Sequence, residues 1–353
     1  MTSKERVRSA AQRKQPDRVP VNFEAVDYVM DKIMKRHALA SQENIYSLYE
    51  VDIRDCSPDY IGPPLEYSIK NGKLLIGNRY GCKMIASTCA GETHWVVQEY
   101  PFGEDSTVAD ILNHNWVNPD WFDYESVKRK CDNYKDKALI FGHEGPYQLS
   151  TYLMNQETLF AKMILDPDVA HALYDRFVQF ELEYYERILM AGDGQIDILR
   201  PHDDYGTQIA SLFSVPMWED YFKENTIKLV ELAHQYGAFY QQHSCGMVRD
   251  VIPSLIDCGV DILEPLQKIP GMEVDALKRD FGNKLCFHGG IDTQSVLPKA
   301  TPEEVRVEVA HYINVLGTGG GYILMASQWF ESDVPVENID ALYEACRDFS
   351  ASI

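Results

Sequence analysis

The chain has 353 residues, of which 45% are hydrophobic and 25% charged, and its formal net charge is −21. This length and composition are typical of a folded globular protein with one large core, so we expect a single domain over residues 1–353. The negative charge argues against nucleic acid and anionic membrane surfaces as partners, because both are bound by basic patches. The expected partner is a small molecule or a protein.

The cysteines and the apolar stretches indicate a cellular location. Eight cysteines are scattered along the chain without a Cys-x-x-Cys spacing. No stretch approaches the ~18 apolar residues of a membrane span, and the chain opens without the apolar core of a signal peptide. We therefore expect reduced thiols and a cytoplasmic location.

The first half of the chain alternates short apolar runs with helical patterns. Buried strands are expected near residues 20, 52, 140 and 198, and helical patterns over 28–37, 42–49, 108–134 and 147–190. From about residue 65 to residue 100, alternating residues are interrupted by turn signals such as Asn71-Gly72 and Gly77-Asn78. This pattern predicts an antiparallel β-ribbon, which we expect to cover a site rather than to build the core.

The second half repeats one strand-helix unit. Strands are expected near residues 240, 262, 286 and 324, each flanked by helices, and their apolar runs lack the period of two that marks a half-exposed strand. Eight such units in a chain of this length predict an α/β fold, a (β/α)8 TIM barrel with the ribbon near residues 65–100 inserted. A doubly wound open sheet is the alternative, but the glycine fingerprint after its first strand is absent.

Polar residues collect where the predicted strands end. They are Asn22, Glu24, Asp52, Asp55, His143, Glu144, His202, Asp203, Asp204, His243, Cys245, Glu264, Gln267, His288, Asp292, Gln328 and Glu331, with Tyr152 and Tyr205 shortly after strand ends. The chemistry of such barrels lies at the carboxyl ends of the strands, so we expect a polar, acidic mouth that contains imidazoles. Each acidic residue could instead cap the helix that follows it.

His243 and Cys245 form the most specific pattern at these strand ends. In an extended segment, residues two apart point to the same side, so the imidazole and the thiolate can reach one metal ion. The alternative is a buried histidine and a small apolar cysteine at a strand end.

Several segments carry a family resemblance. They are Pro16 to Val21, Gly145-Pro146 with Tyr152, Asp203 to Gln208, His243 to Gly246, Gly259 to Gln267, Phe287 to Asp292 and Val334 to Ile339. Together they resemble the uroporphyrinogen decarboxylase superfamily from about residue 16 to residue 348. The resemblance implies a (β/α)8 barrel, in agreement with the strand count.

Two chemistries occur in this superfamily. The haem-pathway decarboxylase has an N-terminal motif with two arginines and a histidine after the last strand. Here the segment Asn22 to Asp27 contains no arginine, and Gln328 stands where that histidine would be. A substrate with eight carboxylates would also meet an acidic mouth. Decarboxylation of uroporphyrinogen is therefore not expected.

The second branch comprises the cobalamin-dependent methyltransferases. The resemblance implies that this chain belongs to this second branch. They hold zinc with His-x-Cys and with a third ligand after the last strand, usually cysteine. The first two ligands correspond to His243 and Cys245, whereas the segment Met325 to Glu331 contains neither cysteine nor histidine. Glu331, Glu264 or Asp204 could be the third ligand, since carboxylates bind zinc.

We therefore predict a zinc-dependent methyltransferase that moves a methyl group between a small molecule, on O, N or S, and a corrinoid carried by a partner protein. Zinc keeps a thiol ionised or polarises the atom from which a methyl departs. Asp203, Asp204, His143 and Tyr152 are expected to orient the reactant, and Asn22, Asp52, His202, Tyr205, Gln267, His288 and Gln328 to line its site. The assembly is left open, with a homodimer as one option.

Three alternatives remain at this point. A metal-free decarboxylase would use Asp52 or Asp55 to stabilise a protonated intermediate and would release carbon dioxide without a corrinoid. Another lyase or isomerase could use the same barrel and would be found by a substrate screen. A corrinoid- or tetrapyrrole-binding module would bind the ring tightly without turnover.

Overall fold

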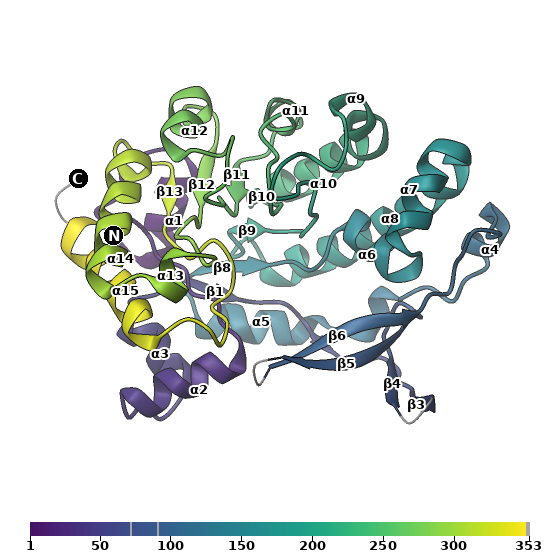
Figure 1. Cartoon of the computed structure of the whole chain (residues 1–353), viewed down its shortest axis with the longest axis horizontal. Helices are drawn as coiled ribbons and strands as arrows, with labels where there is room; N and C mark the ends of the chain where they lie inside the picture. The colour runs from purple at the N-terminus through teal and green to yellow at the C-terminus, as the bar shows by residue number, and fades with distance from the viewer. Residues whose placement is uncertain (71–72, 90–91, 351–353) are drawn as a thin grey trace.

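The computed structural model describes residues 1–70, 73–89 and 92–350, and its centre is a curled sheet of parallel strands. Seven strands follow one another in the order β1-β8-β9-β10-β11-β12-β13. Their bounds are Ile53–Asp55 (β1), Ala138–Phe141 (β8), Ile198–Leu199 (β9), Phe239–His243 (β10), Ile262–Glu264 (β11), Cys286–His288 (β12) and Tyr322–Ile323 (β13). Figure 1 shows these strands side by side, with helices outside them.

The strand expected near residue 20 is a short extended segment that closes the barrel. Val21 forms a parallel bridge with Leu324. The Asn22 N–H donates to the Leu324 carbonyl at 2.9 Å, and the Asp52 N–H donates to the Val21 carbonyl at 2.8 Å. Pro20 has no N–H to donate, which limits regular pairing here. Because this segment lies between β13 and β1, the prediction of a (β/α)8 barrel is confirmed.

Helices cover the outside of the barrel. They are α1 (Ser3–Ala11), α2 (Asp27–Arg36), α3 (Gln42–Leu48), α5 (Tyr124–Asn133), α6 (Pro146–Leu153), α7 (Gln156–Leu165), α8 (Pro167–Gly192), α9 (Val215–Trp218), α10 (Glu224–Gln235), α11 (Ile252–Asp257), α12 (Val274–Phe281), α13 (Val296–Lys299), α14 (Pro302–Tyr312) and α15 (Val336–Ser350), with π-helical turns η2 (Glu219–Lys223) and η3 (Ile313–Gly317). The region 147–190, predicted to be helical with a break near Pro167, contains three helices. None of the described helices is long and apolar enough to cross a membrane.

The inside of the barrel changes from apolar to polar along the strands. At the amino ends, inward side chains such as Ile198, Ile262 and Cys286 form a buried cluster with Val7 and Ala10 of α1. The side chains two positions later point to the same side of each strand. These positions hold Arg200, Gln241, Glu264 and His288, all of them buried. Hydrocarbon therefore fills the bottom of the barrel, and polar groups support its mouth.

Asp52 lies at the amino end of β1, on the side of the barrel away from the mouth. Its fully buried carboxylate pairs with Arg6 at 2.7 Å and with Arg18 at 2.8 Å, and it accepts the Val21 N–H at 2.8 Å. The prediction that Asp52 contacts substrate is wrong in position, because parallel strands present the active site at their carboxyl ends. The residue instead ties the N-terminal segment to the barrel.

The inserted ribbon is a four-stranded antiparallel sheet, as predicted. Its strands β3 (Tyr67–Lys70), β4 (Lys73–Gly77), β5 (Lys83–Cys89) and β6 (Glu92–Glu99) pair in sequence order. The predicted turn residues Asn71-Gly72 lie outside the described residues. Figure 1 shows β5 and β6 below α5 and α6, with β3 and β4 at the lower edge of the molecule.

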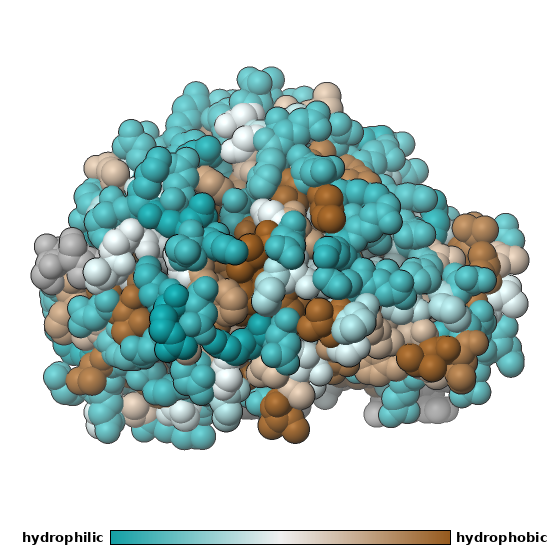
Figure 2. Space-filling view, turned by 90° about the horizontal axis from the view of Figure 1, so that it is seen from above, coloured by the Kyte–Doolittle hydropathy of each residue, from teal (hydrophilic) through white to brown (hydrophobic). Residues whose placement is uncertain are grey.

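The segment after the ribbon differs from the continuous helical pattern expected over 108–134. Between α4 (Val108–Leu112) and α5 lie a 3-10 turn, η1 (Pro119–Trp121), and the short strand β7 (Phe122–Asp123). Strand β7 pairs antiparallel with β2 (Asp59–Tyr60), a contact between distant segments that local periodicity does not reveal. This pair anchors the start of the ribbon. Figure 2 shows that the upper face of the molecule is covered mainly by hydrophilic residues.

Candidate metal centre and active site

Three possible metal ligands converge at the mouth of the barrel. Ligand atoms of Asp204, His243 and Cys245 all lie within 4.8 Å of one another. His243 Nε2 is 3.7 Å from Cys245 Sγ and 3.6 Å from Asp204 Oδ1. The His-x-Cys pair therefore presents both side chains to one point, as its spacing predicts, and the loop after β9 supplies the carboxylate.

Close packing of two loops holds these groups together. The Cys245 N–H donates to Asp204 Oδ1 at 2.8 Å. Gly246 has a φ of 84°, and a Cβ there would lie 2.5 Å from the backbone of Gly206. A larger residue would be strained and would push the loops apart. The Gly246 N–H donates to Gln267 Oε1 at 2.9 Å, so Gln267 supports the loop and does not line the mouth cavity.

Glu264 supports His243 from the side away from the other two ligands. Its Oε2 atom is 2.7 Å from His243 Nδ1, and the carboxylate is buried. Burial opposes charge on both groups, but their mutual attraction raises the pKa of His243 well above its usual value. Against burial, His243 and Arg200 lower the pKa of Glu264. A carboxylate at Nδ1 leaves Nε2 to face a metal, which is the usual arrangement behind a histidine ligand.

The donor set fits zinc. Imidazole nitrogen, thiolate sulfur and carboxylate oxygen are its ordinary protein ligands, and three protein ligands with an open position are typical of catalytic sites. Burial raises the pKa of the Cys245 thiol, although the His243 charge opposes this. Gln328 Nε2 lies 3.6 Å from the sulfur. Glu331 is exposed and lies outside the group, and Asp204 supplies the third possible ligand atom.

A cavity of about 210 Å³ opens beside these ligands. It is lined by Glu24, Glu144, Gln148, Tyr152, His202, Asp204, His243, Gln328 and Trp329. Three of the lining side chains are carboxylates, and none of the described lining residues is a lysine or an arginine. Arg200 reaches Glu24 at 2.7 Å from within the barrel. The charge of the cavity is therefore negative.

Three predicted residues reach the cavity wall besides the ligands. Tyr152 donates from its hydroxyl to Glu144 Oε1 at 3.4 Å. The His202 ring lies 4.6 Å from the His243 ring, and its buried Nε2 atom has no hydrogen-bond partner among the described residues. Burial and the nearby Arg200 lower the pKa of His202 well below its usual value, so the ring is neutral. Gln328 completes this set.

His143 is set back from the cavity and packs between aromatic rings. The ring centres of Phe180, Tyr184 and Tyr185 lie 5.9, 5.2 and 5.3 Å away. Burial lowers the pKa of His143 to about 4. Because His143 does not line the cavity, a direct contact with the reactant has no support from its position.

Asp203 and Tyr205 lie behind the cavity. The buried Asp203 carboxylate accepts the backbone N–H groups of Tyr147 at 3.3 Å and Gln148 at 2.8 Å, and the Tyr205 hydroxyl at 3.1 Å. Burial raises the pKa of Asp203 to about 7, although these hydrogen bonds oppose the shift. Both residues fix the start of α6 and do not line the cavity, unlike Asp204 beside them.

Asn22 and His288 lie deeper in the barrel than expected. Asn22 Nδ2 donates to Glu24 Oε1 at 3.2 Å. His288 Nδ1 lies 3.0 Å from Gln241 Oε1, and Gln241 Nε2 donates to Glu264 Oε2 at 3.3 Å. Burial lowers the pKa of His288 to about 4. Through Gln241 and Glu264, His288 connects with His243 instead of contacting the cavity.

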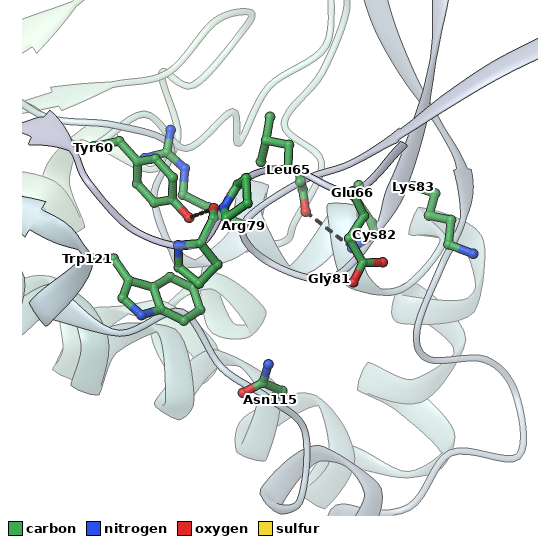
Figure 3. A pocket seen from close by; sticks show the side chains of 13 residues that line it. Tyr60, Leu65, Glu66, Arg79, Gly81, Cys82, Lys83, Asn115 and Trp121 are labelled. Carbon is green, nitrogen blue, oxygen red and sulfur yellow. Dashed lines mark hydrogen bonds between the residues drawn. The ribbon is translucent and has the colours of Figure 1, made fainter. Parts of the chain in front are cut away.

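A second cavity of about 220 Å³ lies beneath the base of the ribbon. Figure 3 shows Tyr60 and Trp121 on one side of it, and Glu66 and Lys83 on the other. The possible metal ligands found among the described residues lie at the barrel mouth instead. The mouth cavity is therefore the candidate active site.

Comparison with known proteins agrees with this architecture. A family model described as uroporphyrinogen decarboxylase (URO-D) matches residues 107–349. The chain belongs to the uroporphyrinogen decarboxylase family. A solved structure described as a methyltransferase from Methanosarcina mazei matches with a TM-score of 0.70 at 18% identity and covers 99% of both chains. That likeness shows the shared fold.

Sequence relatives within the uroporphyrinogen decarboxylase family carry two kinds of name. Methylcobamide:CoM methyltransferase MtaA of Methanosarcina barkeri is 24% identical over 285 residues, which cover 78% of each chain. MtbA of Methanosarcina mazei, with the same description, is 24% identical over 228 residues, covering 64% of this chain and 62% of the relative. The uroporphyrinogen decarboxylase of Pseudoalteromonas translucida is 22% identical over 232 residues, covering 62% and 61%. Membership of this family and the methyltransferase relatives support an enzyme.

Sequence reasoning missed some residues of the mouth. The strand-end pattern includes Glu24 and Glu144 but predicts no role for either, and it does not include Arg200, Gln148 or Trp329. The place of Glu144 shortly after β8 is the signal that indicates a role in the cavity wall. Arg200 follows the same rule, since it comes directly after β9. Gln148 and Trp329 lie in a helix and a loop whose orientation only the packing determines.

Proposed function

We propose that the protein is a zinc-dependent methyltransferase that moves a methyl group between a small molecule and a corrinoid held by a partner protein. The observation that carries this proposal is the convergence of Asp204, His243 and Cys245 beside the mouth cavity. The relatives named as methylcobamide:CoM methyltransferases support a corrinoid as the second reactant. The zinc, the carrier protein and the small molecule are parts of this proposal.

The three possible ligands and the residues around them would have different roles in methyl transfer. When bound, zinc would polarise the O, N or S atom of the small molecule or keep a thiol ionised. Asp204, His243 and Cys245 would hold it, and Glu264 would fix the His243 ring with Nε2 toward the cavity. Tyr152 would hold Glu144 in place at the cavity wall through the hydrogen bond between them.

The charge of the cavity narrows the class of small molecule. The two negative charges of the Asp204 carboxylate and a Cys245 thiolate would balance a divalent ion, and Glu24 is paired with Arg200. Among the ion pairs of the described residues none includes the Glu144 side chain, so this carboxylate adds uncompensated negative charge to the wall. A neutral or cationic reactant fits this wall, whereas an anionic one meets like charge. Trp329, whose side chain is 46% exposed, adds an aromatic surface that suits a cation.

The test is the zinc content and activity of purified protein. Wild type is expected to bind one zinc ion per chain and to change the absorbance of a methylated or reduced corrinoid when a small-molecule partner is added. His243→Ala and Cys245→Ala should lose both properties. His311→Ala, at a half-exposed histidine on α14, is the matched control and should keep them. Full activity in zinc-free wild type would refute the proposal.

Decarboxylation is the competing activity, and the decarboxylase relatives are its support. The acidic cavity argues against a substrate with many carboxylates. Release of carbon dioxide from a carboxylated substrate, without any corrinoid, would favour this alternative. The position of Asp52 at the far end of the barrel removes one residue that it could have used.

A further inference from the structure

The ribbon has one face made of apolar side chains. Directly paired residues in antiparallel strands share a face, and residues two apart along a strand also share it. Following the pairs from Tyr67 through the sheet gives one set: Tyr67, Ile69, Leu74, Ile76, Met84, Ala86, Trp95 and Val97. Among the side chains that the structure describes on this face of the four strands, none is charged. We call this set the ribbon face.

The ribbon face is open to solvent. Tyr67 is 66% exposed, Ile69 78%, Leu74 48% and Trp95 44%. Ala86 is also exposed, and Ile76, Met84 and Val97 are partly exposed. Scattered apolar residues are normal on a surface, but a continuous apolar patch on a projecting element usually marks a contact with another molecule. Burial of such side chains would contribute about 25 cal/mol for each Å² removed from water.

The opposite face of the same strands is different. Leu75 is only 4% exposed there, and the polar residues of this face include Ser68, Lys83, Ser87 and His94. Val96, next to Trp95 in β6, belongs to this opposite face and is 47% exposed. The two residues are therefore equally exposed neighbours that point to opposite sides of one strand. This pair makes the role of the ribbon face open to a controlled test.

We propose that the ribbon face is a dimer interface that pairs with the same face of a second copy of this chain. A two-fold contact places the same patch of both copies against each other, so a patch that carries net charge would repel itself. In a chain with a net charge of −21, most of the surface would repel a second copy, whereas this face has no described charge. The absence of like-charge repulsion on this face is therefore the main reason to propose a second copy of the chain as its partner.

The size and the low polarity of the ribbon face also favour a dimer interface. Two aromatic and two aliphatic side chains, each about half exposed or more, present on the order of 500 Å² of apolar surface, a large part of the ~800 Å² per partner in a standard interface. Lasting homodimer contacts are more apolar than transient ones. A corrinoid carrier would have to leave after each methyl transfer, and such exchange favours a more polar contact.

The experiment measures the mass of the full chain in solution. Light scattering after size exclusion, at low micromolar protein, is expected to give a dimer for wild type and for Val96→Glu, and a monomer for Trp95→Glu. Ile69→Lys is a second variant on the ribbon face, at its most exposed position, in case Trp95→Glu fails to fold. Circular dichroism and the thermal midpoint establish that each variant is folded.

Each outcome decides the proposal. A monomeric wild type, or folded ribbon-face variants that remain dimers, would overturn it. Monomerisation by Val96→Glu as well as by Trp95→Glu would also overturn it, since the effect would then not belong to one face. The proposal is independent of the methyltransferase function, because it depends only on the ribbon and not on the metal site. If a monomeric wild type bound a corrinoid protein and Trp95→Glu abolished that binding, the face would belong to the carrier.

Discussion

The barrel mouth and the ribbon face both belong to connections that follow the carboxyl ends of barrel strands, but they present opposite kinds of surface. In the mouth, polar side chains are largely buried, and neighbours such as Glu264 and Gln267 hold them in place. On the ribbon face, the apolar side chains of Tyr67, Ile69, Leu74 and Trp95 are between 44% and 78% exposed. The fold itself therefore holds the polar groups of the mouth in place, whereas the ribbon face would become buried only by contact with another molecule.

The largest expected effect concerns the third metal ligand, and it tests whether the mouth is a metal site at all. Asp204→Ala should reduce bound zinc from one ion per chain to a small fraction, because only two ligands would remain. Glu331→Ala should leave zinc unchanged, since its exposed side chain lies outside the group. Elemental analysis after dialysis measures both. Retention of zinc by Asp204→Ala would remove Asp204 from the ligand set.

The next largest effect tests whether a buried neighbour of His243 increases the zinc affinity of the mouth. Glu264→Gln keeps the size of the side chain but removes the charge that faces His243 Nδ1 at 2.7 Å. Loss of such a partner usually lowers metal affinity by about 10- to 100-fold. Competition with a zinc chelator would show it. An affinity equal to that of wild type would mean that Glu264 does not act through His243.

A smaller effect concerns the charge of the cavity wall. Glu144→Gln should reduce the preference for a cationic over an anionic methyl donor or acceptor by about tenfold, which corresponds to ~1.4 kcal/mol. The preference is measured as the ratio of kcat/KM for two reactants that differ only in this charge. Gln148→Glu is the reverse variant at the same wall and should increase the ratio. Equal ratios in all three proteins would exclude electrostatic selection by this wall.

The pH dependence of stability tests the polar layer beneath the mouth. Burial lowers the pKa of His288 to about 4, so the folded protein binds its proton less readily than the unfolded chain does. Stability from this residue is therefore present above about pH 6.5 and is lost as the pH falls toward 4, by up to ~1.4 kcal/mol per pH unit.

His288→Gln should remove this part of the slope, because glutamine has no proton to bind. Urea unfolding between pH 4.5 and 7 gives the slope for wild type and variant. His311→Gln, at the half-exposed histidine on α14, is the matched control variant. An identical slope for His288→Gln would show that His288 is protonated at the same pH in both states.

The last variant is expected to have no effect on zinc binding, and it tests whether the ribbon and the mouth are independent. Trp95→Glu should leave zinc content at the wild-type level, since the ribbon face contributes no ligand. Loss of zinc in a folded Trp95→Glu protein would mean that the ribbon and the mouth are coupled.

The fold could be predicted well from the sequence, because its signals are local. Apolar runs such as Ala138–Phe141 and the helical periods between them record which residues are buried, and burial alone fixes a parallel sheet covered by helices. The His243-x-Cys245 pair was also readable, since a spacing of two in a strand places both side chains on one side. The segment near residue 20 was recognised as a strand, although Pro20 leaves it only a bridge.

The sequence alone therefore determined the barrel, the inserted ribbon and two of the three possible ligands, since each depends on neighbours along the chain. Only the tertiary structure decided that Asp204 joins them while Glu264 stands behind His243, because those positions depend on how separate loops and strands meet. It also placed Asp52 at the far end of the barrel, and it showed that the apolar residues of the ribbon gather on one open face. Side chains that are remote in sequence acquire their roles through packing, which no local pattern records.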